Sequence, residues 1–308
     1  RPPRSTLFPY TTLFRLTLAA DDVAPELPPR LIAVGLPEWA ADIAVDGSLI
    51  VPGHSVVEGP GAPWTRVDWL AAAEWHLSAA AEQEFERRHG PIHSYSYRLR
   101  GWDARMWQRA WVNRIALFLR RWASVSLGRA EDELFGPRPS AAIIVTHDVD
   151  AVRKTPSIRI NQSAFQAFQS LRRLSVRKSS DAIRFFFRHQ DYWFFDRITT
   201  LEDRLGIRSH FNFYAGAGGW RRAPKAILMD PGYDVRWPRI RSELQRLSEG
   251  GWTIGLHQSY DAWRDAGRML QQREHLERAA GVPVRSCRQH WLRFSWASTQ
   301  RSDRKSVV

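Results

Sequence analysis

The chain has 308 residues, of which 44% are hydrophobic and 25% charged, a composition typical of globular proteins. Its single cysteine, Cys287, excludes an internal disulfide and a cysteine-rich metal site. The apolar runs are far shorter than the roughly 20 residues of a membrane helix. No signal peptide is visible, so we expect a cytoplasmic location. The net charge of +13 favours anionic partners, but no recognition motif supports binding to nucleic acid.

Both ends of the chain match the translation of a common sequencing adapter. The stretch LFPYTTLFR at residues 7–15 corresponds to one reading frame of the adapter, and DRKSVV at residues 303–308 corresponds to another that runs into a stop codon. We therefore expect residues 1–15 and 303–308 to be adapter-derived and the natural chain to continue past both ends. Part of the positive charge lies in these ends, so the charge is weaker evidence for nucleic-acid binding than the whole chain suggests, although the rest is still basic.

Residues 16–138 predict a smaller, tryptophan-rich α+β domain that precedes the main one. An apolar stretch, LIAVG, predicts a short strand, and DIAVDGSLIVPG predicts two strands joined by a turn at Asp46-Gly47. Helical periodicity covers residues 68–88, and a second amphipathic helix ends at Gly128. Tryptophans at helical spacing are more often core than ligand platform, so we expect them to build this domain's core.

A linker, GPRPS, at residues 136–140 predicts a domain boundary near residue 138. The apolar run Ala141–Val145 after it predicts a buried strand. Farther along the chain, predicted helices that end in glycine alternate with predicted strands. The helices are DRITTLEDRLG, RWPRIRSELQRLSEGG and DAGRMLQQREHLERAAG, and the strands are RSHFNFYAG, WTIGLHQSYDAW and PVRSCRQHWLRFS. This alternation predicts an α/β domain over residues 139–302.

A strongly basic segment, residues 153–188, interrupts this pattern. It carries nine lysines and arginines against one acid, Asp181. One interpretation is a solvated helix pair that covers the domain, and the other is a surface for an anionic polymer or for lipid headgroups. We favour the first, because runs of like charge usually do no more than solvate a face.

Polar side chains follow each predicted strand at its carboxyl end. Such ends meet at one edge of a parallel sheet, where α/β proteins gather their active groups. Carboxylates and imidazoles together suit a divalent metal of the zinc class with an open position for water. The residues concerned are His147, Asp148, Asp150, His210, Asn212, Tyr214, His257, Asp261, Arg288, His290 and Arg293.

Three stretches of this region, THDVD, TIGLHQSYDAW and VRSCRQHWLRFSW, resemble in order and spacing the motifs of the metal-dependent polysaccharide deacetylases. The resemblance covers residues 141–300 and implies a distorted (β/α) barrel. It implies a hydrolase of C–N bonds other than peptide bonds that removes N- or O-linked acetyl groups from a polysaccharide or oligosaccharide. It further implies that Asp148 is the general base, that Asp150 and His257 bind a divalent metal, expected to be zinc, and that Arg288 orients the base.

The chain departs from the family pattern in two places. Asp261 stands where the second motif has its second histidine, so it either binds the metal or caps the following helix, and His290 is an alternative ligand. The family's late motif, which supplies the acid, would follow residue 300, so the resemblance implies a C-terminally truncated barrel with impaired activity. Trp291 and Tyr214 are the expected sugar contacts. The rival hypothesis is a non-catalytic barrel that binds polysaccharide or an anionic surface.

Overall fold

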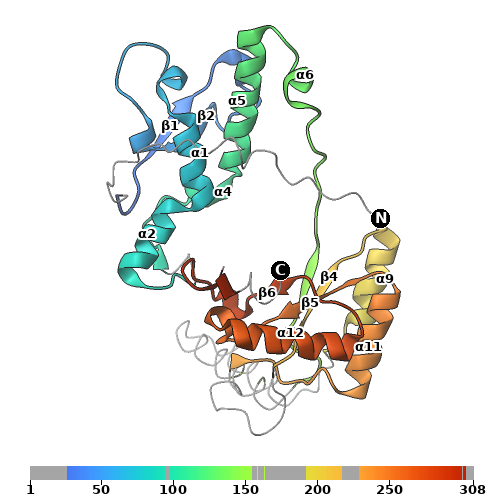
Figure 1. The fold of residues 1–308 in the computed structure, drawn as a ribbon. Coiled ribbons are helices and arrows are strands. Elements are labelled where there is room, and N and C mark those ends of the chain that lie inside the picture. Colours follow the sequence, from blue (N-terminus) through green and yellow to red (C-terminus); the bar gives the residue numbers. More distant parts are fainter. Residues whose placement is uncertain are drawn as a thin grey trace, which may run out of the picture. The chain divides into compact units, whose positions relative to one another are not determined.

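The structure is a computed structural model that describes residues 26–93, 98–154, 158, 163, 192–216, 229–299 and 301–302 (Figure 1). Residues 1–15 and 303–308 and nearly all of the basic segment lie outside this part, so the hypotheses about them stay predictions. The chain forms two compact units. The first runs to Arg88 and includes Gly101–Gly136, and the second comprises His89–Arg100 and the chain from Pro137 onward.

The sheet of the first unit pairs strand β1, Leu31–Gly35, with the antiparallel strand β2, Ser48–Pro52. The predicted turn at Asp46-Gly47 is present, with φ of 50° and 76°, the left-handed values that a tight two-residue turn requires. The predicted strand before the turn is wrong. The 3-10 helix η2, Glu38–Ala40, precedes that stretch, residues 42–44 form a turn and a bend, and Val45 makes an isolated bridge to Ser48.

The helix predicted over residues 68–88 is two helices, α1, Trp69–Ser78, and α2, Ala80–His89. Asp68 caps α1 by accepting a hydrogen bond from the backbone nitrogen of Ala71 at 2.9 Å. Ala79 lies between the helices in the left-handed conformation, with φ of 52°. The break lets the first turn of α2 enter a small separate core, because Ala81 is buried beside Trp75 and Met106.

The second predicted helix is also divided, into α4, Arg105–Gln108, and α5, Trp111–Leu127, which ends at the left-handed Gly128 as expected. The remaining elements of this unit are the short helices η3, Gly53–Ser55, η4, Pro63–Arg66, and α6, Glu131–Phe135. The expectation that tryptophans build the core is confirmed for Trp69, Trp75 and Trp111, which are buried. Trp64, Trp102 and Trp122 are partly buried against the cores, whereas Trp107 is 41% exposed.

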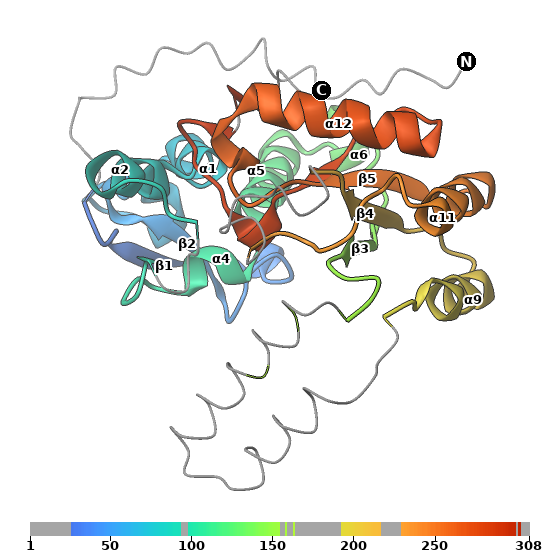
Figure 2. The ribbon, with the colours of Figure 1, turned by 90° about the horizontal axis from the view of Figure 1, so that it is seen from below.

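The second unit contains a curled, four-stranded parallel sheet that forms half of a barrel wall. Its strands are β3, Thr146–Val149, β4, His210–Tyr214, β5, Thr253–His257, and β6, Cys287–Arg288, in that spatial order. Helices α9, Phe195–Leu205, α11, Pro238–Glu249, and α12, Ala266–Ala280, lie in an arc along one side of it (Figure 2). Short 3-10 helices η5, Ala262–Arg264, and η6, His290–Leu292, follow β5 and β6.

The first strand of this sheet is displaced from its predicted position. The run Ala141–Val145 is not a strand, and Ile143 and Ile144 are 91% and 70% exposed. The reason is pairing: β4 begins at His210, which pairs with Thr146 and whose backbone nitrogen donates to the oxygen of Val145 at 2.9 Å. Upstream of Val145, the described part of the chain offers no neighbouring strand, so apolar character alone does not bury the run.

The other strands and helices of this unit lie where the alternation predicts, although β6 has two residues only. Alternate strand residues face the helices, and Val149, Phe213 and Leu256 share one row of the buried core. The other face carries Asp148 and Asn212 in the next row. Within the described residues, no helix is both long and apolar enough to cross a membrane.

Candidate metal centre

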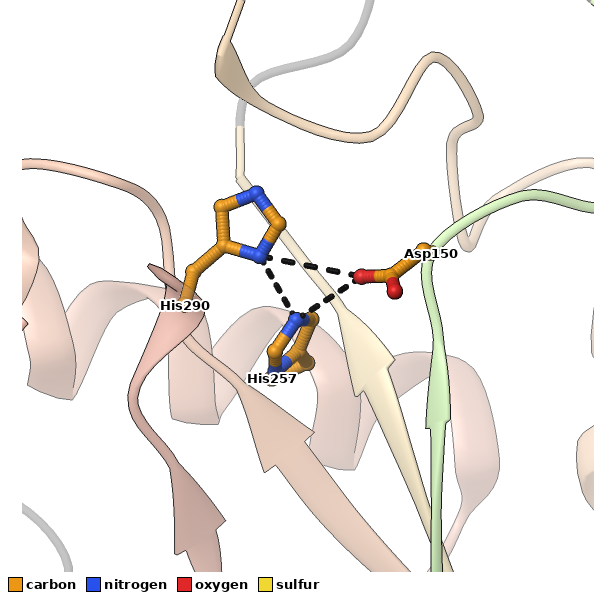
Figure 3. Close-up of side chains that lie close together, drawn as sticks. All are labelled: Asp150, His257 and His290. Atoms are coloured by element: carbon orange, nitrogen blue, oxygen red, sulfur yellow. Dashed lines mark hydrogen bonds and ion pairs between the residues drawn. The ribbon is translucent and has the colours of Figure 1, made fainter. Parts of the chain in front are cut away.

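Three side chains of metal-ligand type converge beyond the carboxyl ends of the strands (Figure 3). Asp150 follows β3, His257 ends β5, and His290 begins the 3-10 helix η6 just after β6. One donor atom from each lies within 4.8 Å of the other two. Asp150 Oδ1 is 3.1 Å from His257 Nε2 and 3.7 Å from His290 Nδ1, and the two imidazole nitrogens are 2.7 Å apart.

The hydrogen bond between His290 and the Met229 carbonyl shows which ring nitrogen of His290 carries the proton. Its Nε2 lies 2.6 Å from the carbonyl oxygen of Met229, which only accepts hydrogen bonds, so Nε2 carries the proton and donates. Nδ1 therefore presents its lone pair to Asp150 and His257. A metal-binding histidine usually has this arrangement, in which the other ring nitrogen donates to a carbonyl and fixes the orientation of the ring.

The three residues fit a divalent ion of the zinc class. Two nitrogens that each bind a tetrahedral ion at about 2.0–2.1 Å would be about 3.3 Å apart, so His257 and His290 need to separate by less than an ångström. Two imidazoles and one carboxylate are also a ligand set of catalytic zinc sites, and they leave one position open. The buried Nδ1 of His257 has no hydrogen-bond partner among the described residues, so no competing contact holds this ring in another orientation.

The surroundings of Asp150 and His290 lower the pKa of both side chains. Removal of Asp150 from part of its hydration raises its pKa, but the hydrogen bond from His257 and the electrostatic interaction with both imidazoles outweigh this and leave the pKa below its usual value. Burial and the neighbouring His257 lower the pKa of His290, although the Met229 carbonyl opposes them. An ionised carboxylate beside neutral imidazoles is the protonation state in which all three can bind a metal.

A second carboxylate lies beside the cluster. Asp148 is two residues before Asp150 and has its own partners: Oδ1 accepts from Asn212 Nδ2 at 3.0 Å, and Oδ2 lies 3.4 Å from Arg288 Nε. Gly255 makes room for this pairing, because a Cβ at that position would lie 2.1 Å from Asn212 Oδ1. Asp148 is thus held between an amide and a guanidinium, apart from the imidazoles.

Both carboxylates open into one cavity of about 790 Å³. The five predicted polar residues Asp148, Asp150, His257, Arg288 and His290 line it together. Apolar and aromatic side chains form much of the remaining wall, among them Ile158, Tyr192, Phe194, Met229, Pro231, Trp291 and Leu292. Trp291 is 62% exposed, so its ring is accessible to a molecule that enters the cavity.

Asp261 has neither of the two roles predicted for it, metal ligand or helix cap. It is not part of the cluster, whose third member is His290. It precedes the 3-10 helix η5 without a capping hydrogen bond from its side chain, and the helix after that, α12, is capped instead by Asp265, which accepts from the backbone nitrogen of Arg268 at 3.0 Å. Four-residue spacing would bring residues 257 and 261 together on a helical turn, but this stretch leaves the strand as a loop.

Tyr214 does not contact the cavity either. Its side chain is 2% exposed, and its hydroxyl donates to Asp230 Oδ2 at 3.4 Å. His147 also faces away from the cavity, because it is on the helix-covered face of β3 and its Nε2 lies 2.7 Å from Glu202 Oε1. Strand alternation accounts for this, since His147 and Asp148 are consecutive residues.

Two contributors to the site had no role predicted from the sequence. Asn212 is among the polar residues predicted at the strand ends but was given no role, and the register between β3 and β4 is what pairs it with Asp148. The Met229 carbonyl has no sequence signal. Trp291 and Leu292 adopt φ of 57° and 52°, a left-handed conformation that is strained for these residue types. This turn sets the directions of the adjacent side chains of His290 and Trp291.

The chain has no match among known protein families, curated proteins or solved structures.

Proposed function

We propose that this protein is a metal-dependent hydrolase that removes N- or O-linked acetyl groups from a polysaccharide or oligosaccharide. The observation that carries the proposal is the pairing of two sites in one cavity. A cluster of metal-ligand type, Asp150, His257 and His290, lies beside a separate carboxylate, Asp148, that Arg288 and Asn212 hold. Hydrolysis with an activated water requires a binding position for the ion and an independent base.

Asp150, His257 and His290 would hold the ion, which we propose to be zinc. A bound zinc ion lowers the pKa of a coordinated water and polarises a carbonyl group. Asp148 would accept the proton of the attacking water, because it lines the same cavity as the cluster but its partners are Asn212 and Arg288. Arg288 pairs with one carboxylate oxygen of Asp148, and the Asn212 amide orients the other.

The wall of the cavity suits a sugar. Trp291 is exposed at the rim and offers the flat apolar face on which pyranose rings stack. The indole Nε1 donates to the Met229 carbonyl at 3.1 Å, so the same backbone oxygen accepts from His290 and from Trp291. This shared acceptor fixes the Trp291 ring relative to His290, which supports the proposed stacking role.

The test measures zinc content and acetate release in parallel. The purified 308-residue chain is loaded with zinc and incubated with an N-acetylated chitooligosaccharide and with an O-acetylated xylo-oligosaccharide. Asp148→Asn is expected to bind zinc with unchanged stoichiometry and to lose about 10²- to 10⁴-fold in acetate release, the usual contribution of a general base. Glu274→Gln, an exposed carboxylate on α12, is the matched control and is expected to behave as wild type.

Two outcomes would contradict the proposal. Equal acetate release by Asp148→Asn would remove this residue from the role of base. Zinc binding by wild type without acetate release from either sugar would contradict hydrolysis and would favour a barrel that binds polysaccharide without cleaving it.

A further inference from the structure

The two loops that carry the histidines of the cluster are joined by one side chain, Arg293. It lies three residues after His290, and its guanidinium is 4.1 Å from the ring centroid of Tyr260 and 5.3 Å from that of Trp263. Tyr260 is in turn three residues after His257. The side chain therefore spans from the loop after β6 to the loop after β5, and a planar guanidinium over aromatic faces is a directional contact.

His93 fixes Arg293 from a remote part of the sequence, 200 residues earlier. Arg293 Nη2 lies 3.3 Å from His93 Nε2, and since a guanidinium only donates, that nitrogen must accept. Nδ1 of His93 then carries the proton and donates to the carbonyl oxygen of Phe294 at 3.1 Å. The ring also packs edge-on against Trp263 at 4.6 Å between centroids. One imidazole thus holds both the side chain of Arg293 and the backbone of the next residue.

The loop after β5 is also connected to the cluster through a third segment, which contains Met229 and Asp230. The backbone nitrogen of Tyr260 donates to Asp230 Oδ1 at 2.6 Å, and Asp230 follows Met229, whose carbonyl accepts from His290. Moving Tyr260 would therefore shift the residue next to the acceptor that orients His290. The strained turn at Trp291 and Leu292 lies between His290 and Arg293, so Arg293 restrains one end of that turn.

We infer that Arg293 and His93 are positioning residues for the metal centre, which set the separation and orientation of His257 and His290 without touching the ion. This inference rests on the metal-binding part of the proposed function and is independent of acetate hydrolysis. It gives a role to His89–Arg100, a segment that belongs to the second unit although the sequence predicts it within the first domain.

A purely stabilising role is the alternative, and the chain contains a matched example. Arg208 lies 4.2 Å from the ring centroid of Trp252, but this pair precedes β4 and β5 and is at the opposite ends of the strands from the cluster. If Arg293 only stabilised the fold, its loss would have the same consequences as the loss of Arg208.

The experiment measures zinc affinity by competition with a chromophoric chelator, together with the visible spectrum of the cobalt-substituted protein. Thermal unfolding is followed on the same samples. Arg293→Leu and His93→Leu are expected to weaken zinc binding about tenfold, the lower end of the range for outer-shell partners, and to alter the cobalt spectrum. His93→Gln is expected to restore most of the affinity, because its side-chain oxygen can accept from Arg293. Arg208→Leu is expected to unfold at a lower temperature with wild-type zinc affinity.

Wild-type zinc affinity and cobalt spectra in folded Arg293→Leu and His93→Leu would overturn the inference, as would an equal loss of affinity in Arg208→Leu. Absence of zinc binding by the wild-type chain would overturn it as well. If the leucine variants do not fold, Arg293→Lys carries the test, since lysine keeps the charge but not the planar stacking, and unchanged affinity there would contradict the role. A failure of acetate release alone affects only the proposed function.

Discussion

Asn212 and Gly255 are paired across the neighbouring strands β4 and β5, and the absent side chain of Gly255 is what allows the Asn212 amide to reach Asp148. A Cβ at Gly255 would lie 2.1 Å from Asn212 Oδ1 and 2.8 Å from Ser286 Oγ. The orientation of the proposed base therefore depends on a residue that touches neither the base nor the metal ligands.

Gly255→Ala is expected to displace Asn212 and break its hydrogen bond to Asp148. We expect the free energy of unfolding to fall by about 1–3 kcal/mol, as for other overpacked interiors, and acetate release to fall with it. Chemical denaturation and kinetics on the same samples measure the two effects. Gly35→Ala, also in a strand but with nothing within 4 Å of the added Cβ, is the control. Wild-type kinetics in Gly255→Ala would show that Asn212 does not orient the base.

Arg288→Lys is expected to retain the positive charge and lose the guanidinium geometry that faces Asp148 Oδ2 at 3.4 Å. Because the residue acts on the base and is not a ligand, zinc affinity should stay within a few-fold of wild type while kcat for acetate release falls by about 10²-fold. Arg285→Lys, exposed and three residues earlier, provides the comparison. A parallel loss of zinc would assign Arg288 to the metal site instead.

His290→Ala and Asp261→Ala separate the two hypotheses for the third ligand. His290 lies within the cluster, so its loss should weaken zinc binding by more than the roughly 10–100-fold typical of an outer-shell partner. Asp261 is not in the cluster, so its substitution should leave the zinc affinity within a few-fold of wild type. Chelator competition measures both constants. The reverse order of effects would mean that the loop after β5 rearranges when metal binds.

Glu202 is a buried carboxylate that connects β3 with the residues just before β4 and β5, so it should make the fold sensitive to acid. It is 3% exposed and accepts hydrogen bonds from Ser209 and Trp252 and bonds to His147. Burial raises its pKa, but these hydrogen bonds outweigh burial and leave the pKa below its usual value of 4.5. A lowered pKa in the folded state means that the stabilisation is complete above pH 4.5 and is lost as the pH falls through the folded value.

Glu202→Gln is therefore expected to unfold about 1–3 kcal/mol more easily at pH 7, the cost of replacing hydrogen bonds to a charged group. The difference from wild type should shrink as the pH falls below 4.5, because wild-type Glu202 then becomes protonated. Urea unfolding between pH 3 and pH 7 measures this, with Glu274→Gln as the control. A difference that does not vary with pH would show that Glu202 contributes by shape and not by charge.

The sequence predicted the second unit well because its signals are local and agree with one another. Apolar strands alternate with helices that end at glycines such as Gly206 and Gly281, both of which are left-handed in the structure. Parallel strands that end at a common edge then bring Asp148, Asp150, His257 and Arg288 together, without any knowledge of side-chain contacts.

What could not be predicted depends on contacts between distant residues. The run Ala141–Val145 has strand composition but lacks a neighbouring strand where the described sheet begins, and the break at Ala79 depends on which core α2 enters. Spacing along the chain left Asp261 open as a metal ligand or a helix cap, because spacing does not show that the chain after His257 leaves the strand as a loop. His93 lies 200 residues from Arg293, and no local pattern connects them.

The left-handed backbone at Trp291 and Leu292 also limits how this protein can be engineered. Each such residue costs of the order of 1–3 kcal/mol, so glycine or asparagine at Leu292 is an obvious route to a more heat-resistant protein. A relaxed turn would also let His290 and Trp291 sample other directions. Thermostability and the proposed metal and sugar binding are thus opposed at this position, and a library selected for heat resistance alone would favour proteins in which both proposed sites are less well ordered.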